Sequence, residues 1–280
     1  MTASYQEKKS IEITIQSGQR RLFPDFREAW QFRDLMFILA IRDTKLRYKQ
    51  TLLGILWVML QPLLAALILA TFFGYFARLS SDGIPFVIFV FSALLPWNLF
   101  SGILARAGNS ILKDSALMSK VYFPRVILPI SSSLAVVVDF LVTLVVMIFL
   151  MLFYKITPSA NIVFLPFLSI IVVIIGLGVS LFFSAVSVYY RDFVHVLPFV
   201  SQIWFYASPI IYSTSIVPAH LRQIYALNPW VGLINAFRWS LLGGHFPWQS
   251  LSVSIVISMI MFIVGAMVFE RIERNFVDAA

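Results

Sequence analysis

The feature that most constrains this chain is a run of 35 residues, 156–190, without a single Asp, Glu, Lys or Arg. A bilayer core of about 30 Å takes about 20 helical residues to cross. Six apolar stretches reach or approach that length, at 52–77, 84–105, 126–154, 162–190, 194–212 and 250–269. They are apolar on every face and far longer than the roughly 10 alternating residues of a barrel strand. The sequence therefore predicts an all-α integral membrane protein with six transmembrane helices.

The composition agrees with this prediction. Charged residues make up 12% of the 280 residues and hydrophobic residues 60%, and the mean hydropathy is +0.89. A soluble domain carries about 25% charged residues. The polar side chains are too few to cover a soluble core, which excludes an ordinary soluble enzyme, and a disordered or fibrous chain is excluded as well. Because the sequence has no cysteine, disulfides, thiolate nucleophiles and cysteine-based metal sites are also excluded.

The distribution of Lys and Arg predicts the topology. Seventeen of the 21 lie before the first stretch, in the second and fourth connections or after the last stretch, and only four lie in the other connections. Cytoplasmic loops hold the excess of Lys and Arg, so both termini are expected on the cytoplasmic side of the cytoplasmic (inner) membrane. The same distribution explains the net charge of +8 without nucleic acid as a partner.

Three segments outside the stretches have a recognisable character. Residues 1–25 are polar and are set apart from the membrane domain, which is expected to span 26–280. Residues 26–41 mix apolar and charged positions, which predicts an amphipathic helix in the cytoplasmic interface, or otherwise a soluble N-terminal helix. Residues 106–125 form either a cytoplasmic docking element or an ordinary amphipathic loop. Residues 213–249 are too apolar for a solvated loop, which predicts two short re-entrant or interfacial helices on the outer side.

Sites for catalysis are missing from the sequence. The dipeptide Gly-Lys never occurs, so the chain cannot form a P-loop for ATP. The three histidines have no partner at metal-ligand spacing, so no metal site is expected, and the stretches hold no paired carboxylates for acid–base chemistry. Asp139 is the one charged residue inside a stretch. It is either a proton or substrate site, or a hydrogen-bonded side chain packed against Ser131 to Ser133 or another helix.

Aromatic residues are abundant, with 27 Phe, 10 Tyr and 7 Trp. Most of the tryptophans near the ends of the stretches fit the ordinary aromatic belt at the lipid interface. The others could line a path for a sugar chain, because sugar rings present C–H faces that pack on aromatic rings without needing charge. The candidates lie in the first and fifth stretches and are Phe72, Phe73, Tyr75, Trp204, Phe205, Tyr206 and Tyr212.

Seven short segments, in order along the chain, give the sequence a specific resemblance. It resembles the membrane subunit (permease) of ABC-2 type transporters that export O-antigen, teichoic acid and related polysaccharides, over about residues 34–240. The segments are RDTKLRYKQTLLGILWVMLQP (42–62), PWNLFS (96–101), SKVYFPRVILPI (119–130), YYRDFVHVLP (189–198), SPIIYS (208–213), LNP (227–229) and FRWSLLGG (237–244).

The resemblance implies a function and partners. Two copies of the permease would pair with two copies of a separate P-loop ATPase, which would use ATP and Mg²⁺, while this chain would hold no cofactor and would not be an enzyme. The cargo would be a polysaccharide linked to polyprenyl pyrophosphate. Segments 26–41, 106–125 and about 189–195 would contact the ATPase. The coupling candidates are Lys113, Asp114, Lys120, Tyr122, Arg125, Arg191 and Asp192.

The lipid pyrophosphate is anionic and must be received at the cytoplasmic surface before the sugar enters. Arg42, Lys45, Arg47 and Lys49 lie just before the first stretch. Arginine can hold phosphate oxygens through two parallel hydrogen bonds. Arg42, Arg47 and Lys49 are therefore predicted to receive the pyrophosphate, although the same residues could serve only to fix topology and contact anionic lipid.

Three other functions remain open at this point. The chain could belong to an exporter of the same type with another cargo, such as a drug or a lipid. It could be a carrier or channel that works without ATP, or an integral membrane enzyme that processes glycans. A neighbouring gene for a P-loop ATPase would favour the exporters, and neighbouring glycosyltransferase genes would favour a glycan cargo.

Overall fold

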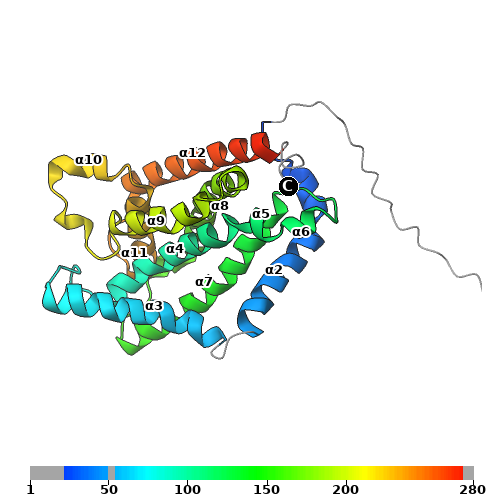
Figure 1. The fold of residues 1–280 in the computed structure, drawn as a ribbon. Helices are drawn as coiled ribbons and strands as arrows, with labels where there is room; N and C mark the ends of the chain where they lie inside the picture. The colour runs from blue at the N-terminus through cyan, green and yellow to red at the C-terminus, as the bar shows by residue number, and fades with distance from the viewer. Residues whose placement is uncertain (1–21, 50–53, 274–280) are drawn as a thin grey trace, which may run out of the picture.

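The computed structural model describes residues 22–49 and 54–273, and within them the chain forms helices joined by irregular segments (Figure 1). Five helices of this part are long and apolar enough to cross a membrane. They are α3 with its π-helical extension η1 (Ile55–Phe76), α4 (Phe86–Ala107), α7 (Ile127–Phe153), η2 with α8 (Ala160–Tyr189), and α12 (Trp248–Glu273). Each matches a predicted stretch to within a few residues, except that positions 52–53 lie outside the described residues.

The predicted span at 194–212 is not confirmed. Helix α9 covers Phe193–Tyr206, which is 14 residues. At 1.5 Å per residue it is about 21 Å long, shorter than the bilayer core. Beyond it the backbone bends through Ser208 to Tyr212, where Ile210 donates a hydrogen bond to the carbonyl of Ser208. The apolar run continues, but the helix does not, so composition alone overestimated this element.

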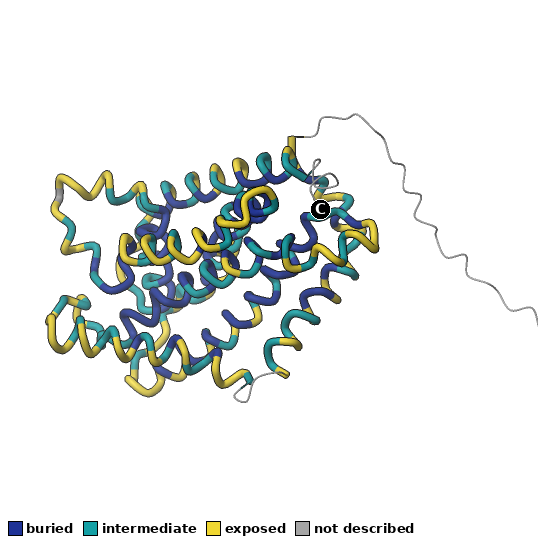
Figure 2. The backbone as a smooth tube through the Cα atoms, viewed as in Figure 1, coloured by how far each residue is buried: buried dark blue, intermediate teal, exposed yellow. Residues whose placement is uncertain are grey.

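Helix α4 lies at the centre of the bundle. It is buried over most of its length, whereas α3 is mostly exposed (Figure 2). Helices α7, α8 and α11 (Pro229–Leu242) pack around α4. The main core includes Phe89, Phe100, Ile175, Trp230 and Phe237, all buried. The fold therefore presents α3, rather than α4, to whatever surrounds the bundle.

Helices α8 and α12 approach each other most closely through glycines. A Cβ atom added at Gly265 would lie 1.9 Å from the carbonyl oxygen of Gly178, and one added at Gly178 would lie 2.4 Å from Cα of Phe262. Small residues allow such backbone contact between helices in a membrane. Two other small residues of α8, Gly176 and Ser180, lie against Ile103 of α4.

The N-terminal helix is longer than its amphipathic pattern predicted. It consists of α1 (Phe26–Gln31), capped by the side chain of Asp25, and α2 (Arg33–Lys49). One side packs on a second core that includes Phe123, Leu128 and Phe269. The other side exposes apolar residues, which an interfacial helix needs, although its position in the interface stays a prediction. These residues are Trp30, Phe37, Ile38 and Ile41.

The described ends of the chain lie together. Phe26 of α1 stacks on Phe262 of α12, with ring centroids 6.2 Å apart. The short helices α5 (Ser110–Lys113) and α6 (Ser115–Met118) lie at the same end of the bundle, on the right in Figure 1, and η1 and α10 (Arg222–Tyr225) lie at the opposite end. The arrangement therefore has two distinct ends, and the segments predicted to be cytoplasmic gather at one of them.

Candidate functional site

A charge cluster forms where the end of α2 meets α4 and α7. Asp139 of α7 is at its centre. Its Oδ2 accepts a hydrogen bond from Nη2 of Arg106 at 2.9 Å and another from Nη1 of Arg47, and its Oδ1 accepts one from the Tyr48 hydroxyl at 2.7 Å. Arg47 and Tyr48 are neighbours in the last turn of α2, and Arg106 is in the last turn of α4. Three elements thus converge on one carboxylate.

The cluster holds more positive than negative charge. Two guanidinium groups surround one carboxylate, whose side chain is only 12% exposed. Tyr48 adds no negative charge, because burial raises the pKa of its hydroxyl and the Asp139 carboxylate raises it further. Desolvation makes such a group costly unless its charges stay balanced. Removal of the carboxylate would therefore leave two partly buried guanidinium groups without a contact that both make.

A pocket of about 270 Å³ opens beside the cluster. Its volume is just below the roughly 300–1,000 Å³ of typical small-molecule sites, so it suits a phosphate-sized group or a few waters rather than a sugar chain. The pocket lies between α3, α4 and α7. Its polar lining consists of Arg47, Gln61, Asn98, Ser101, Asp139 and Thr143.

The two alternatives for Asp139 can now be compared with the structure. Its partners belong to other helices, as the second alternative stated, but Ser131 and Ser133 are not among them. Their hydroxyls donate to carbonyls of their own helix, at 3.0 and 2.8 Å. Arg106 was not recognised as a partner from the sequence. It lies 33 positions before Asp139. A positive charge at the end of an apolar stretch is ordinarily explained by membrane topology, and only the packing of α4 against α7 shows that it contacts Asp139.

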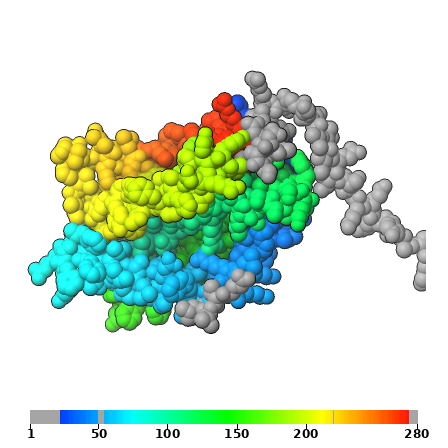
Figure 3. Space-filling model, in the orientation of Figure 1, coloured from blue at the N-terminus to red at the C-terminus, as the bar shows by residue number. Residues whose placement is uncertain are grey.

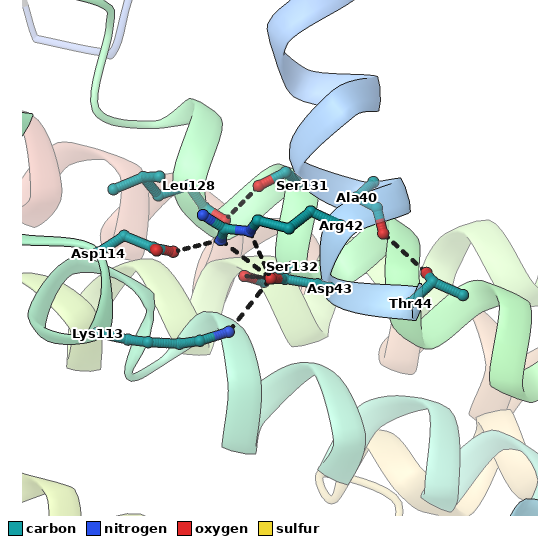
Figure 4. Close-up of polar contacts among 9 residues, drawn as sticks. All are labelled: Ala40, Arg42, Asp43, Thr44, Lys113, Asp114, Leu128, Ser131 and Ser132. Carbon is teal, nitrogen blue, oxygen red and sulfur yellow. Dashed lines mark hydrogen bonds and ion pairs between the residues drawn. The ribbon is translucent and has the colours of Figure 1, made fainter. Parts of the chain in front are cut away.

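A second charge cluster joins α2 to the connection between α4 and α7 (Figure 4). Nη2 of Arg42 lies 3.0 Å from Asp43 and 3.0 Å from Asp114, and Nζ of Lys113 lies 3.3 Å from Asp43. Ser132 of α7 adds a hydrogen bond to Asp43 at 3.5 Å. The charges alternate in sign, so this cluster is balanced, and it fixes α2 to the loop predicted to contact the ATPase.

The predicted coupling residues fall into two groups. Asp114 and Lys113 face α2, and Arg125 faces the end of α12, where its Nη1 donates to the carbonyl of Glu273 at 2.6 Å. The remaining residues have exposed side chains at the same end of the bundle. They are Lys120, Tyr122, Arg191 and Asp192.

The predicted pyrophosphate residues are also divided. Arg42 belongs to the balanced cluster, and Arg47 belongs to the cluster around Asp139. Lys49 is exposed at the last position of α2, and Lys45 is exposed one turn earlier. Of the three predicted residues, only Arg47 lines the pocket.

The aromatic residues predicted to line a path for the sugar chain differ in how exposed they are. Trp204 and Phe205 pack into an aromatic core, where Trp204 lies 5.4 Å from Phe100 and Phe205 lies 5.6 Å from Trp97, measured between ring centroids. Phe73 also packs on the core, and Tyr212 shares a hydrogen bond with Tyr225. The other three are exposed, namely Phe72, Tyr75 and Tyr206.

The five long apolar helices of the described residues define a multi-pass membrane protein. The sequence profile of the ABC-2 type transporter family matches residues 34–242. The chain therefore belongs to the ABC-2 type transporter family, whose members work in a membrane with an ATPase partner.

The known relatives to which this chain is similar are named for the transport of polysaccharides. The chain is 28% identical to an O-antigen export system permease protein RfbA of Klebsiella pneumoniae, over 88% of this chain and 94% of the relative. It is also 28% identical to the protein of that name in Myxococcus xanthus, over 90% and 98%. Its identity to the polysialic acid transport protein KpsM of Escherichia coli is 25%, over 84% and 92%. The family resemblance predicted from the sequence is confirmed.

Proposed function

We propose that this chain is the transmembrane subunit of an ATP-driven exporter that moves a polysaccharide linked to polyprenyl pyrophosphate across the cytoplasmic membrane. The observation that carries the proposal is the match to ABC-2 type transporters over residues 34–242, together with relatives named for O-antigen and polysialic acid transport. The missing P-loop sequence agrees with a separate ATPase that uses ATP and Mg²⁺. In this proposal two copies of the chain assemble with two ATPase subunits, and both termini are cytoplasmic.

The exposure of the helices supports a path between two copies. Helix α3 is apolar yet mostly exposed, which leaves it available to face a second copy or the cargo. Phe72 and Tyr75 of η1, and Tyr206 at the end of α9, are exposed enough to contact a sugar chain. The partly buried aromatics Trp204 and Phe205 instead pack α9 against the core.

The first expected result concerns ATP. The purified chain is expected to hydrolyse no ATP, because its sequence lacks a loop to hold the phosphates. ATP hydrolysis should appear when the cognate ATPase subunit is added, and cells that lack the chain should lose surface glycan while lipid-linked glycan accumulates inside. ATP hydrolysis by the chain after removal of every other protein, or unchanged surface glycan without the chain, would contradict the proposed function.

The second expected result concerns docking to the ATPase. Lys120→Glu or Arg191→Glu should weaken co-purification with the ATPase by at least about tenfold, since like charges brought together at an interface cost several kcal/mol. Both side chains are exposed, so the fold should survive. Asp114→Lys is less informative because it also breaks the pair with Arg42. Lys155→Glu, an exposed charge reversal at the opposite end, is the matched control. Wild-type levels of co-purification for Lys120→Glu, Arg191→Glu and Lys155→Glu would show that this end does not bind the ATPase.

Arg47 is proposed to exchange between Asp139 and the lipid pyrophosphate. Arg47→Lys keeps the charge, so topology and pairing with Asp139 should survive, but it removes the two-pronged hydrogen bond to phosphate. We expect surface glycan to fall by about tenfold at normal membrane levels of the chain. Arg33→Lys, at the exposed start of α2, is the control. Full export by both Arg47→Lys and Arg47→Gln would remove Arg47 from the site that receives the substrate.

A further inference from the structure

A large pocket lies at the end of the bundle opposite α5 and α6. Its volume is about 1320 Å³, more than that of typical small-molecule sites. It is enclosed by the loop at 82–84, by residues 213–226, by α11 and by the start of α12. In the space-filling view the cyan and yellow segments, which include two of these walls, form the left-hand end of the molecule (Figure 3). The pocket shares no lining residue with the smaller pocket beside Asp139.

One face of α11 supplies the floor of this pocket. The helix begins at Asn228, whose side chain accepts a hydrogen bond from the backbone of Trp230, and its buried face packs into the main core. Asn235, Arg238 and Trp239 line the pocket. Their spacing of three and four residues places them together on one side of a helix. This face of α11 thus presents an amide, a guanidinium and an indole to the same space.

Arg238 is the unusual residue of this wall. Its Nη2 donates to the carbonyl of Ile210 at 3.1 Å, and its guanidinium lies 3.6 Å from the ring centroid of Phe89. Its Nε is shielded from solvent and has no hydrogen-bond partner within 22–49 and 54–273, and Asp82, another residue of the pocket lining, is the carboxylate whose charge acts on the guanidinium. A shielded donor without a partner is uncommon in native proteins and calls for an explanation.

The remaining walls combine aromatic rings with groups that form hydrogen bonds. Trp239 lies 4.5 Å from Phe246, measured between ring centroids, and Trp248 is 64% exposed. Asp82 accepts a hydrogen bond from Ser213 at 2.7 Å, and Gln249 adds an amide. Exposed aromatic faces beside amide, hydroxyl and guanidinium groups are suited to sugar rings, which have apolar faces and many hydroxyl edges.

We propose that this pocket binds a segment of the saccharide chain on the outer side of the membrane, with sugar rings against Trp239 and Trp248 and sugar hydroxyls beside the polar groups of the lining, Asn235, Arg238 and Gln249. The inference rests on the proposed function, since it assumes that a glycan passes this end of the bundle. The pocket would hold several sugar residues after they leave the path, and the binding would oppose their return.

The test is photo-crosslinking in cells that make the glycan. A photoreactive phenylalanine derivative replaces Trp248 in the tagged chain, and in a second strain it replaces Phe153, which is 71% exposed but does not line the pocket. After illumination, slower-migrating forms of the chain are examined with a periodate-based carbohydrate stain. Stained adducts are expected at position 248 and should be at least about tenfold weaker at position 153. Arg238→Gln should reduce the adduct at 248 by about tenfold, since it removes a charged hydrogen-bond donor.

Two further arms identify the ligand. In a strain that cannot synthesise the lipid-linked glycan, the adduct at position 248 should disappear. An adduct that persists there and does not stain for carbohydrate would identify a lipid headgroup and overturn the proposal. If export depends on the chain but position 248 gives no glycan adduct, the pocket assignment fails and the proposed function stands. If surface glycan does not depend on the chain, the proposed function fails, and the glycan-binding pocket fails with it.

Discussion

Gly265→Val should prevent stable folding of this protein. The Cβ atom of any residue other than glycine at this position would lie 1.9 Å from the carbonyl oxygen of Gly178. The obstacle is backbone on the neighbouring helix, so no change of side-chain conformation can remove it, and α8 and α12 must move apart. Overpacking of this kind costs up to about 3 kcal/mol and occasionally more. We expect little of the variant to remain in the membrane and a clear loss of thermal stability in detergent.

The neighbouring position in the same helix provides the control. Val264 is 45% exposed, so Val264→Leu changes the same turn of α12 without entering the contact with α8. It should be as abundant and as stable as the wild type. Gly265→Ala should fall between the two, because it adds a Cβ without the two methyl groups. Normal stability of Gly265→Val would mean that α8 and α12 do not pack backbone to backbone.

Asp139→Asn should have the second largest effect. It keeps the shape of the side chain but leaves Arg47 and Arg106 without the carboxylate that both contact. The two guanidinium groups are 34% and 28% exposed, so solvent compensates part of the loss, and we expect a cost of about 1–3 kcal/mol. We expect lower thermal stability of the purified chain and loss of glycan export. Asp34→Asn, which neutralises an exposed carboxylate at the start of α2, is the matched control and should be neutral.

The balance between the two arginines and the one carboxylate can be tested with further variants. Arg106→Gln leaves one arginine beside one carboxylate, so it should be milder than Asp139→Asn. The double variant Asp139→Asn with Arg106→Gln should be more stable than Asp139→Asn alone, since one of the two guanidinium groups that contacted the carboxylate is gone. Additive losses in the double variant would contradict the idea that excess positive charge causes the defect.

Most of the membrane domain could be predicted because each helix that crosses a bilayer must satisfy its own backbone hydrogen bonds within apolar surroundings. That requirement is local and appears directly in the sequence. The prediction of a span at 194–212 is not confirmed, because the apolar run continues beyond the helix, which ends at Tyr206. The sequence pattern also underestimated the N-terminal helix, which continues to Lys49, because a basic segment is as compatible with a helix as with a loop.

The candidate site was only partly predictable. Asp139 and Arg47 were both noted from the sequence, one as a costly charge within a stretch and the other as a phosphate-binding candidate. Their contact was not foreseen, because 92 positions separate them along the chain. The aromatic residues of α9 show a different limit of the sequence. Trp204 and Phe205 are residue types that could line a path for sugars, but in the structure they pack on the core.

The sequence by itself determined that this chain has apolar helices long enough to cross a membrane, that it contains no P-loop motif, and which family it resembles. These properties depend on the length, composition and order of segments. The tertiary structure decided which charges meet, which aromatics are exposed, and that α4 rather than α3 is buried. The reason is that in a bundle of uniformly apolar helices the sequence specifies no preferred buried face, so partners are chosen by close packing and by the few polar groups that must find one another.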